Sequence, residues 1–485
     1  MDDIRSPDRR REFGAHLTSV EIFKKFILPR IKDVLYEYTW MDLFCGAGNL
    51  VLPILEMIPE NKRIDFFKNH MLLFDIQSEM VEKAIENAQK YGIPREIAIK
   101  NIQVRDTLLN YPDLKALQYP PFHITNPPYL YLGYIAKKSK RNLKYFTGEN
   151  KGYQDLYQIA MMNDLRHGIE KMVYIIPTNF LFGFSVSNKI RKDFLPFYDI
   201  RSAVIFERRI FEFTGVNVCI CFFERRGRAS HKPITFRALK VSNETKEREY
   251  NLLPQNFYRA GGEFDDYVSR FKSPKPLKIK FYLTLEEVQK NKGLLPVRLI
   301  DANSFSNGRY DAGVYFVSEE LYSKIKKNPL FIRTLDTGQW DGRAGIYDIR
   351  ETFKADGIIT TKEKYRTHPI QIFIEPELEE EDLILLKNYF NFMLEHLRNL
   401  TDSEFLTTFK YSNSNYVRKY LGLSQVKKLI ETFPVHLMSQ NIKKKFKILI
   451  EQKNADGIKN LLLEFKKGLE LFPDLIFQNK EGIHH

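Results

Sequence analysis

The sequence has few cysteines and no long apolar run, and these absences exclude several classes of protein. Its 485 residues include three cysteines, Cys45, Cys219 and Cys221, which are too few for a disulfide framework and lack the partner ligands of a zinc site. We expect all three to be small apolar residues within strands. No stretch approaches the roughly 18 consecutive apolar residues that suggest a membrane-spanning helix, and the charged residues 1–13 contain no apolar signal core. The sequence therefore predicts a soluble, cytoplasmic protein.

Internal repeats, low-complexity segments and a nuclease pattern are also missing from the sequence. A nuclease pattern would be an acidic pair followed by Glu-x-Lys, so we expect no cleavage of nucleic acid by this chain. The charged residues are unbalanced, because 75 Lys and Arg against 61 Asp and Glu give a net charge of +14. Such an excess favours a polyanionic partner, although it says nothing about sequence-specific binding. The length predicts about two or three domains.

The segment from His123 to Tyr129 is an apolar run that stops at Asn126, Pro127 and Pro128, and we call its last four residues the acceptor loop. Consecutive prolines cannot continue a sheet, because each lacks the N–H and has a fixed φ, so we expect a buried strand that ends at Asn126. An ordinary turn would use the same residues. They could also hold a planar amine such as that of adenine. The side-chain carbonyl of Asn126 and the main-chain carbonyl of Pro127 can accept its two hydrogens, while Tyr129 can stack against a base rotated out of a duplex.

A second apolar strand begins at Thr39 and leads into the segment from Asp42 to Gly48, which also contains Gly46. Glycines let the backbone adopt strained angles and approach a ligand closely, and a helix after them favours a carboxylate or phosphate at its N-terminus. We predict such a helix over about residues 49–58. The third glycine of the dinucleotide fingerprint is missing, which argues against NAD and leaves a different adenosine-containing ligand open.

Two further predicted strands are followed by carboxylates. The strand Met71–Phe74 ends on Asp75, where a carboxylate can accept hydrogen bonds from both hydroxyls of a ribose, although Asp75 could instead start a helix. The strand Ile102–Val104 is followed by Asp106, which can accept from the amino group of an adenine ring. After Asp75, Ser78 can cap a helix with one apolar face. Alternating strands and helices indicate a parallel sheet, whose ligands gather at the carboxyl ends of the strands. We therefore predict one pocket there that holds the glycines, both carboxylates and the acceptor loop.

The order and spacing of these segments resemble those of S-adenosylmethionine-dependent N6-adenine DNA methyltransferases, in particular the gamma class of type II restriction-modification systems. The matching segments are His16 to Thr18, Asp42 to Gly48, Asp75, Asp106 and Asn126 to Tyr129. The resemblance covers residues 14–225, about half of the chain. It implies an α/β fold, in which a Rossmann-like class I methyltransferase domain with a parallel central sheet is followed by a mixed α+β target recognition domain.

We place the boundary between these domains in the basic stretch around Arg225 to Pro233. The catalytic domain would then span residues 1–235, and the recognition domain, as one domain or two subdomains, residues 236–485. Another basic run, Lys137 to Tyr145, directly follows the acceptor loop. It either meets DNA phosphates or forms a solvated face.

The resemblance implies S-adenosyl-L-methionine as the cofactor and double-stranded DNA as the substrate, with no metal. The flipped base would lie between Tyr129 and a second aromatic residue, for which Phe211 is our choice and Phe213 the alternative, and burial in the core would explain either phenylalanine. The implied cofactor-binding residues are Leu17, Thr18, Asp42, Phe44, Gly46, Gly48, Asp75, Asp106 and Asn126. The implied catalytic residues are Asn126, Pro127, Pro128, Tyr129 and Phe211.

The second half is expected to mix short strands with helices, and the resemblance implies that it reads the DNA sequence. We predict strands at residues 313–317 and 370–374 and helices at residues 379–400, 417–421, 425–432 and 442–453. Candidate base contacts, chosen by residue type alone, are Arg309, Tyr310, Arg333, Arg343, Lys410, Tyr411, Asn413 and Asn415. For any single one of them, an exposed surface position is the alternative.

Other classes of protein use the same acceptor loop. Methyltransferases of protein glutamine and some RNA adenine methyltransferases also carry Asn-Pro-Pro-Tyr, because a primary amide presents the same planar nitrogen. A DNA-binding specificity partner without catalysis is a further alternative, although the complete set of pocket residues argues against it. We expect a monomer, and the sequence leaves open whether a companion restriction endonuclease exists.

Overall fold

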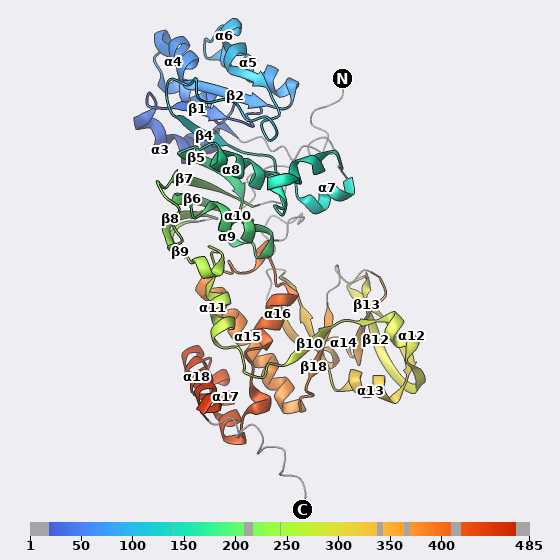
Figure 1. Cartoon of the computed structure of the whole chain (residues 1–485). Coiled ribbons are helices and arrows are strands. Elements are labelled where there is room, and N and C mark those ends of the chain that lie inside the picture. The colour runs from blue at the N-terminus through green and yellow to red at the C-terminus, as the bar shows by residue number, and fades with distance from the viewer. Residues whose placement is uncertain are drawn as a thin grey trace, which may run out of the picture. The chain divides into compact units, whose positions relative to one another are not determined.

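Two units make up the part of the chain that the computed structural model describes, namely residues 19–138, 140–207, 217–242, 244–336, 343–362, 369–408 and 419–471 (Figure 1). The first unit extends to Gly262 and the second begins at Glu263. Each unit has its own clusters of buried apolar side chains. Among the helices of these ranges, none is both long and apolar enough to cross a membrane.

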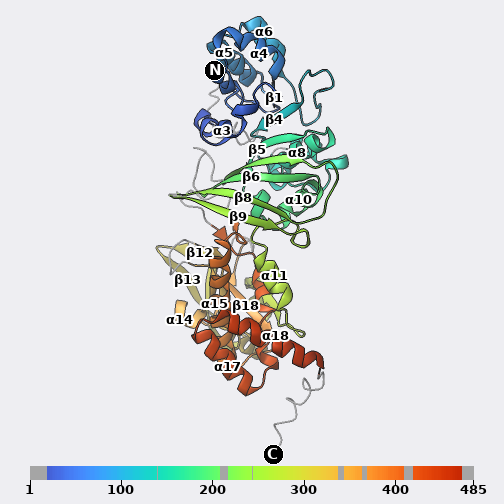
Figure 2. The same ribbon diagram turned by 90° about the vertical axis from the view of Figure 1, so that its left-hand side faces the viewer.

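A nine-stranded sheet forms the centre of the first unit, in the order β3-β2-β1-β4-β5-β7-β6-β8-β9 (Figure 2). Its strands are β1 Thr39–Asp42, β2 Met71–Asp75, β3 Ile102–Val104, β4 Pro121–Thr125, β5 Lys171–Pro177, β6 Tyr198–Phe206, β7 Val218–Arg225, β8 Ile234–Val241 and β9 Thr245–Leu252. Strands β1 to β5 are parallel to one another, and β7 runs antiparallel to β5 and β6. Strands β4 and β5 are buried almost throughout, as is typical of parallel strands with both faces covered. The sheet confirms the predicted Rossmann-like α/β fold.

Helices pack beside the strands of this sheet, and α4, α5 and α6 lie next to β1 and β2 (Figure 1). Helix α4 spans Arg63–His70, α5 spans Ser78–Lys90, α6 spans Arg95–Asn101 and α8 spans Leu156–Arg166. The predicted helix after Asp75 is confirmed, although its N-cap residue is Gln77 and not Ser78, and its buried face includes Val81, Ala84 and Ile85. Helix α8 is buried from Leu156 to Leu165. Its polar side chains must therefore find partners inside the protein.

The helix predicted over residues 49–58 is wrong. The structure has a turn there, followed by a 3₁₀ helix, Leu52–Met57. Proline explains the difference, because a helix that began at Asn49 would need an N–H from Pro53 for its first hydrogen bonds, and proline has none. The glycines therefore lead into a tight turn and not into an α-helix.

The domain boundary predicted after residue 235 lies inside the sheet of the first unit. Strand β8 pairs in parallel with β6, and β9 pairs antiparallel with β8. The basic stretch from Arg225 to Pro233 connects β7 to β8 and is not a linker between units. Every second residue of the first half of β8 is buried, so burial of this apolar face keeps the strand in the first sheet. The first unit consequently ends after Gly262.

The second unit contains two four-stranded sheets and a group of C-terminal helices (Figure 1). The first sheet has the order β10-β18-β14-β16, with β10 Lys278–Phe281, β18 Ile370–Glu375, β14 Leu330–Arg333 and β16 Gly345–Asp348. The second has the order β11-β17-β12-β13, with β11 Leu283–Thr284, β17 Gly357–Thr360, β12 Lys292–Ser306 and β13 Arg309–Val317. The helices are α15 Glu380–Thr401, α16 Leu423–Ile430, α17 Gln440–Glu451 and α18 Ala455–Leu471.

Most elements predicted in this half are confirmed, including both strands and the helices that correspond to α15, α16 and α17. The helix predicted at residues 417–421 is wrong in its described part, where Lys419–Tyr420 form strand β20 and pair with β15, Leu335–Asp336. The N–H of Leu421 also donates to the carbonyl of Thr334 at 2.8 Å. Pairing with a distant strand therefore overrides the local helical pattern.

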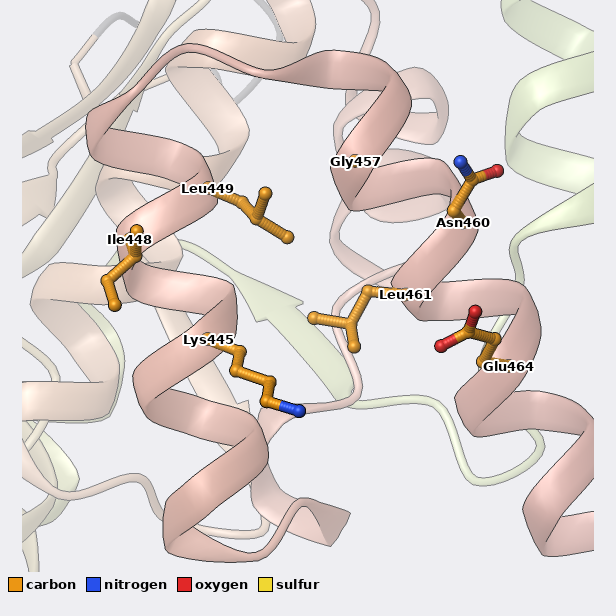
Figure 3. A pocket seen from close by; sticks show the side chains of 7 residues that line it. All are labelled: Lys445, Ile448, Leu449, Gly457, Asn460, Leu461 and Glu464. Atoms are coloured by element: carbon orange, nitrogen blue, oxygen red, sulfur yellow. The ribbon is translucent and has the colours of Figure 1, made fainter.

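An open surface hollow of about 340 Å³ lies between helices α17 and α18 (Figure 3). Apolar side chains of Leu449 and Leu461 point into it, and Lys445 and Glu464 lie at its sides. None of the residues predicted to bind cofactor or target base lines it. This hollow therefore has no part in the predicted cofactor and target-base site.

Candidate active site

The carboxyl ends of four neighbouring strands bring most of the predicted site residues to one edge of the first sheet. Because β3, β2, β1 and β4 are parallel neighbours, their last residues lie along the same edge. Asp42 and Asp75 are the last residues of β1 and β2, and Asn126 directly follows β4. The strand order changes direction between β1 and β4, which is the switch point where open α/β sheets bind their ligands.

Asp42 joins the end of β1 to the end of β4. Its Oδ1 accepts hydrogen bonds from the hydroxyl of Thr125 at 2.7 Å and from the N–H of Phe44 at 3.0 Å. The side chain is almost fully buried, and this burial raises the pKa of Asp42 to about 6, against the opposing effect of the Thr125 hydrogen bond. Asp42 therefore holds the ends of these two strands together, and its own contact with a cofactor stays a prediction.

The raised pKa of Asp42 predicts that stability falls as the pH rises. A carboxyl whose pKa is about 6 when folded and about 3.9 when unfolded favours folding while it is protonated, and this contribution is lost between about pH 4 and pH 6. Asp42→Asn keeps the acceptor oxygen without the ionisation. From pH 4 to pH 8, we expect the free energy of unfolding of the native chain to fall by about 3 kcal/mol more than that of Asp42→Asn. Urea unfolding at pH 4 and at pH 8 measures this difference. Asp65→Asn, at an exposed carboxylate, is the control. Equal changes of the unfolding free energy with pH in both variants would contradict the prediction.

The segment from Leu43 to Gly48, which we call the glycine turn, is bonded to the end of β2. The N–H of Cys45 donates to the carbonyl of Phe74 at 2.8 Å, and Gly46 and Gly48 have φ values of 53° and 81°. A Cβ on Gly48 would lie 2.5 Å from Cδ1 of Leu52. Only glycine fits this turn without strain, so the conformation of the turn depends on its glycines.

Asp75 links the glycine turn to the loop after β2. One of its oxygens accepts from the N–H of Gly46 at 2.8 Å and the other from the N–H of Gln77 at 2.9 Å. Burial raises the pKa of Asp75. Each carboxylate oxygen can accept more than one hydrogen bond, so the predicted contacts with ribose hydroxyls fit beside the two backbone contacts. Ile76, the next residue, exposes 45% of its surface and offers an apolar face at this edge, which was not predicted from the sequence.

Asp106 lies two residues beyond the end of β3 and is half-buried. Its Oδ2 accepts from the hydroxyl of Tyr145 at 2.8 Å, and Nζ of Lys144 lies 3.6 Å from the same atom. Both partners belong to the basic run that follows the acceptor loop, and burial together with the Asp106 hydrogen bond raises the pKa of Tyr145. This part of the run therefore contacts the predicted cofactor edge, and the binding of adenine by Asp106 stays a prediction.

The acceptor loop places the amide of Asn126 next to a buried hydroxyl. The hydroxyl of Tyr129 is bonded to Oδ1 of Asn126 and lies 2.6 Å from the carbonyl oxygen of Ile175. A phenol has one hydrogen, so Tyr129 can donate to one of these acceptors at a time. Asn126 and Pro128 are half-buried, while Pro127 and Tyr129 are buried. The structure thus gives Tyr129 a contact that orients Asn126, and its stacking on a base stays a prediction.

Several predicted residues lie outside the described ranges. They are Leu17, Thr18, Phe211, Phe213, Lys410, Tyr411, Asn413 and Asn415. Of the candidate base contacts that the structure describes, Arg309 is exposed next to the turn between β12 and β13, and Tyr310 packs against Phe305 and Phe353. Arg333 lies over the ring of Tyr347. These positions leave their roles as predictions.

A polar group behind the acceptor loop, buried except for the half-buried Tyr111, was not predicted from the sequence. It consists of His123 on β4, Asp164 on α8, Tyr174 on β5 and Tyr111. The sequence contains a signal for this group, because His123 and Asp164 are polar residues within an apolar strand and an apolar helix. Within the described ranges, no three His, Cys, Asp or Glu side chains form a group that could hold a metal ion.

A family model described as N-6 DNA methylase matches residues 10–300. Among solved structures, the type IIL restriction-modification enzyme MmeI in complex with DNA is 12% identical, with a TM-score of 0.53 over 99% of this chain and 78% of that one. The type I EcoKI M protein is 14% identical, with a TM-score of 0.35 over 47% of this chain. A type I methyltransferase subunit from Streptococcus thermophilus is 15% identical, with a TM-score of 0.35 over 52%. This chain spans 49% and 57% of the lengths of these two proteins. No curated protein sequence matches it significantly.

Proposed function

Since this chain belongs to the N-6 DNA methylase family, we propose that it transfers a methyl group from S-adenosylmethionine to N6 of an adenine rotated out of duplex DNA. The reaction is that of a site-specific adenine DNA methyltransferase. The order of the sequence motifs further supports a place in the modification part of a restriction-modification system. A companion endonuclease and a monomeric state are parts of the same proposal.

The observation that carries the proposal is the position of Asn126 directly beyond β4, next to the glycine turn. The hydrogen bond from Thr125 to Asp42 joins the two strand ends at 2.7 Å, so the acceptor loop and the glycine turn leave the sheet side by side. A methyl donor bound at the turn and an amine bound at the loop would then be neighbours. Holding two reactants in the correct orientation can supply much of the rate enhancement of a direct transfer.

The residues at the strand ends fit S-adenosylmethionine. When bound, the cofactor supplies an electrophilic methyl group on a sulfonium sulfur. The backbone of Gly46 and Gly48 permits close approach of the methionine end, the two oxygens of Asp75 accept from the ribose, and Ile76 offers an apolar face to the adenine ring. Asp106 can accept from the adenine amino group with the oxygen that Tyr145 does not use.

The acceptor loop orients the target amine. The lone pair of the exocyclic amine of adenine is delocalised into the ring, so the amine attacks efficiently only if its hydrogens are held and its lone pair faces the methyl group. Oδ1 of Asn126 and the carbonyl of Pro127 accept these two hydrogens. When Oδ1 accepts from the base, the hydroxyl of Tyr129 can donate to the carbonyl of Ile175 instead, which lies 2.6 Å away.

The second unit, which begins at Glu263, is proposed to recognise the DNA target. It contains all the candidate base contacts that the structure describes, and Arg side chains can pair with guanine in the major groove. The first unit carries the catalytic residues. This assignment moves the predicted domain boundary to the end of the first unit.

Comparing methyl acceptors tests the proposed function. Purified chain is incubated with tritiated S-adenosylmethionine and with duplex DNA, RNA or a protein extract, and the products are analysed as nucleosides or amino acids. We expect label in duplex DNA as N6-methyladenine, and no label in a matched duplex of guanine and cytosine only. Label in RNA or in protein glutamine, but not in DNA, would reject the proposal in favour of the other enzymes with this loop.

A further inference from the structure

A buried histidine connects the glycine turn to the strand that carries the acceptor loop. His123 lies on β4, three residues before Asn126, and its side chain is completely buried. Its Nε2 accepts the N–H of Leu43, the first residue of the glycine turn, at 3.2 Å. Because a backbone N–H can only donate, Nε2 must be the unprotonated nitrogen and Nδ1 carries the hydrogen. The histidine therefore has a fixed tautomer, in which Nε2 accepts a hydrogen bond and Nδ1 donates one.

The Nδ1 hydrogen of His123 points to a carboxylate that gathers three donors. Oδ2 of Asp164 lies 2.6 Å from Nδ1 of His123 and accepts from the hydroxyl of Tyr174 at 2.6 Å, while Oδ1 accepts from the hydroxyl of Tyr111 at 2.7 Å. Asp164 is also completely buried. Its partners come from β4, from β5 and from the connection between β3 and β4, so one carboxylate holds three segments together. Three donors offset much of the cost of burying such a group.

Like a catalytic triad, this group combines a histidine, a carboxylate and hydroxyl groups, but a substrate cannot reach it. His123, Asp164 and Tyr174 have no exposed surface, and they lie before the strand ends rather than beyond them. They therefore do not touch substrate. A buried, fully bonded polar network fixes the relative positions of the segments that it joins.

Helix α8 holds the acceptor loop from both sides. Asp164, near its end, binds His123 before the loop, and Asp155, directly before its start, accepts from the N–H of Leu130 after the loop at 2.7 Å. Through Leu43, the same histidine holds the start of the glycine turn. We propose that the His123–Asp164 pair is a positioning device that sets the glycine turn, and with it the methyl donor, in line with the amine held by the acceptor loop. This inference rests on the proposed function.

Two substitutions at one position separate the two sides of the histidine. In His123→Asn, the side-chain N–H₂ can still donate to Asp164, but the acceptor for Leu43 is lost. In His123→Gln, the longer side chain can bring its oxygen to the Leu43 N–H. With saturating cofactor and DNA, we expect kcat to fall by about 30- to 100-fold in His123→Asn, because a displacement of 1 Å can cost about 100-fold. We expect a smaller fall, of about 5- to 10-fold, in His123→Gln, which keeps the acceptor for Leu43 but loses the donor to Asp164.

Hydrogen exchange supplies a readout that does not depend on activity. In the full-length chain, mass spectrometry of a peptide that spans Leu43 to Leu50 should show faster exchange in His123→Asn than in the native chain. His123→Gln should restore native exchange, and a peptide from α15 in the second unit should be unchanged in both. Native exchange of the Leu43 to Leu50 peptide in His123→Asn would overturn the positioning role, whether or not the chain is active.

A purely structural role of the histidine would give a different pattern. Both variants would then lose activity in proportion to their loss of folded protein, without rescue by glutamine, and that result would overturn the inference.

If neither histidine variant folds, Tyr174→Phe removes one donor to Asp164 and should lower kcat by about 5- to 10-fold without raising either KM. Tyr198→Phe, which removes a buried hydroxyl that donates to Ile169 at 2.6 Å, is the control and should change kcat less than twofold. Equal effects of the two tyrosine variants would also overturn it.

The two proposals can fail separately. If the native chain methylates no DNA but the exchange pattern follows His123 as expected, the positioning contact stands and the proposed function fails. If the native chain methylates DNA and His123→Asn does so equally fast, the function stands and the positioning role fails.

Discussion

Asn126→Ala is expected to lower the rate of methyl transfer to duplex DNA by on the order of 10³-fold, while the Kd for S-adenosylmethionine changes less than about threefold. Asn126 is the residue whose side-chain oxygen can face the target amine, and alanine leaves the hydroxyl of Tyr129 with the carbonyl of Ile175 as its acceptor. The contacts of Asp75 with the glycine turn do not involve Asn126. Single-turnover methylation measures the rate, and isothermal titration calorimetry measures cofactor binding.

Two further variants sharpen the test of Asn126. Asn126→Asp keeps an acceptor oxygen but changes the charge and the hydrogen-bonding pattern, so its rate should fall between those of the alanine variant and the native chain. Asn251→Ala, at an exposed asparagine on β9, should leave both rate and affinity unchanged. Retention of more than about a tenth of the native rate by Asn126→Ala would reject its role as the principal acceptor.

The sequence predicted the first sheet well because its strands are marked by local signals. Strand β2 is a short apolar run that ends on Asp75, strand β3 is followed by Asp106 after one further residue, and consecutive prolines follow the run that contains β4. The boundary at residue 235 was wrong because β8 joins the sheet by pairing with β6. Paired residues of these two strands, such as Ser202 and Arg237, lie 35 residues apart in the sequence, so no local signal indicates the pairing. A basic, small-residue stretch such as 225–233 looks the same in a linker and in a turn.

The candidate site also contains residues that could be predicted from the sequence and contacts that could not. Asp75, Asn126 and the glycines could be found because each stands where a strand ends, and parallel strands bring their ends together. His123 and Asp164 could not be paired from sequence, since 41 residues separate them and each alone resembles a core polar residue. The contact between Tyr145 and Asp106 was equally hidden, because the basic run suggested solvent or phosphate as its partner.

Asp75→Ala is expected to weaken the binding of S-adenosylmethionine by on the order of 10²- to 10³-fold. The substitution removes the acceptors of the Gly46 and Gln77 N–H groups, and each buried donor left without a partner costs about 1–3 kcal/mol. It also removes the proposed acceptors of the ribose hydroxyls. With saturating cofactor, kcat should fall less than about tenfold, because the amine-binding oxygens of the acceptor loop remain.

A cofactor analogue separates the two contributions of Asp75. Calorimetry with S-adenosylhomocysteine and with its 2′,3′-dideoxy form, on native chain and on Asp75→Ala, gives a double-mutant cycle. If Asp75 holds the ribose, its loss should weaken binding of the hydroxylated ligand by about tenfold or more beyond the effect on the dideoxy form. Equal losses for both ligands would show that Asp75 acts through the glycine turn alone. Asp348→Ala, which removes an acceptor of the Glu351 N–H at 2.9 Å in the second unit, should leave the binding of both ligands unchanged, because that capping contact belongs to the other unit.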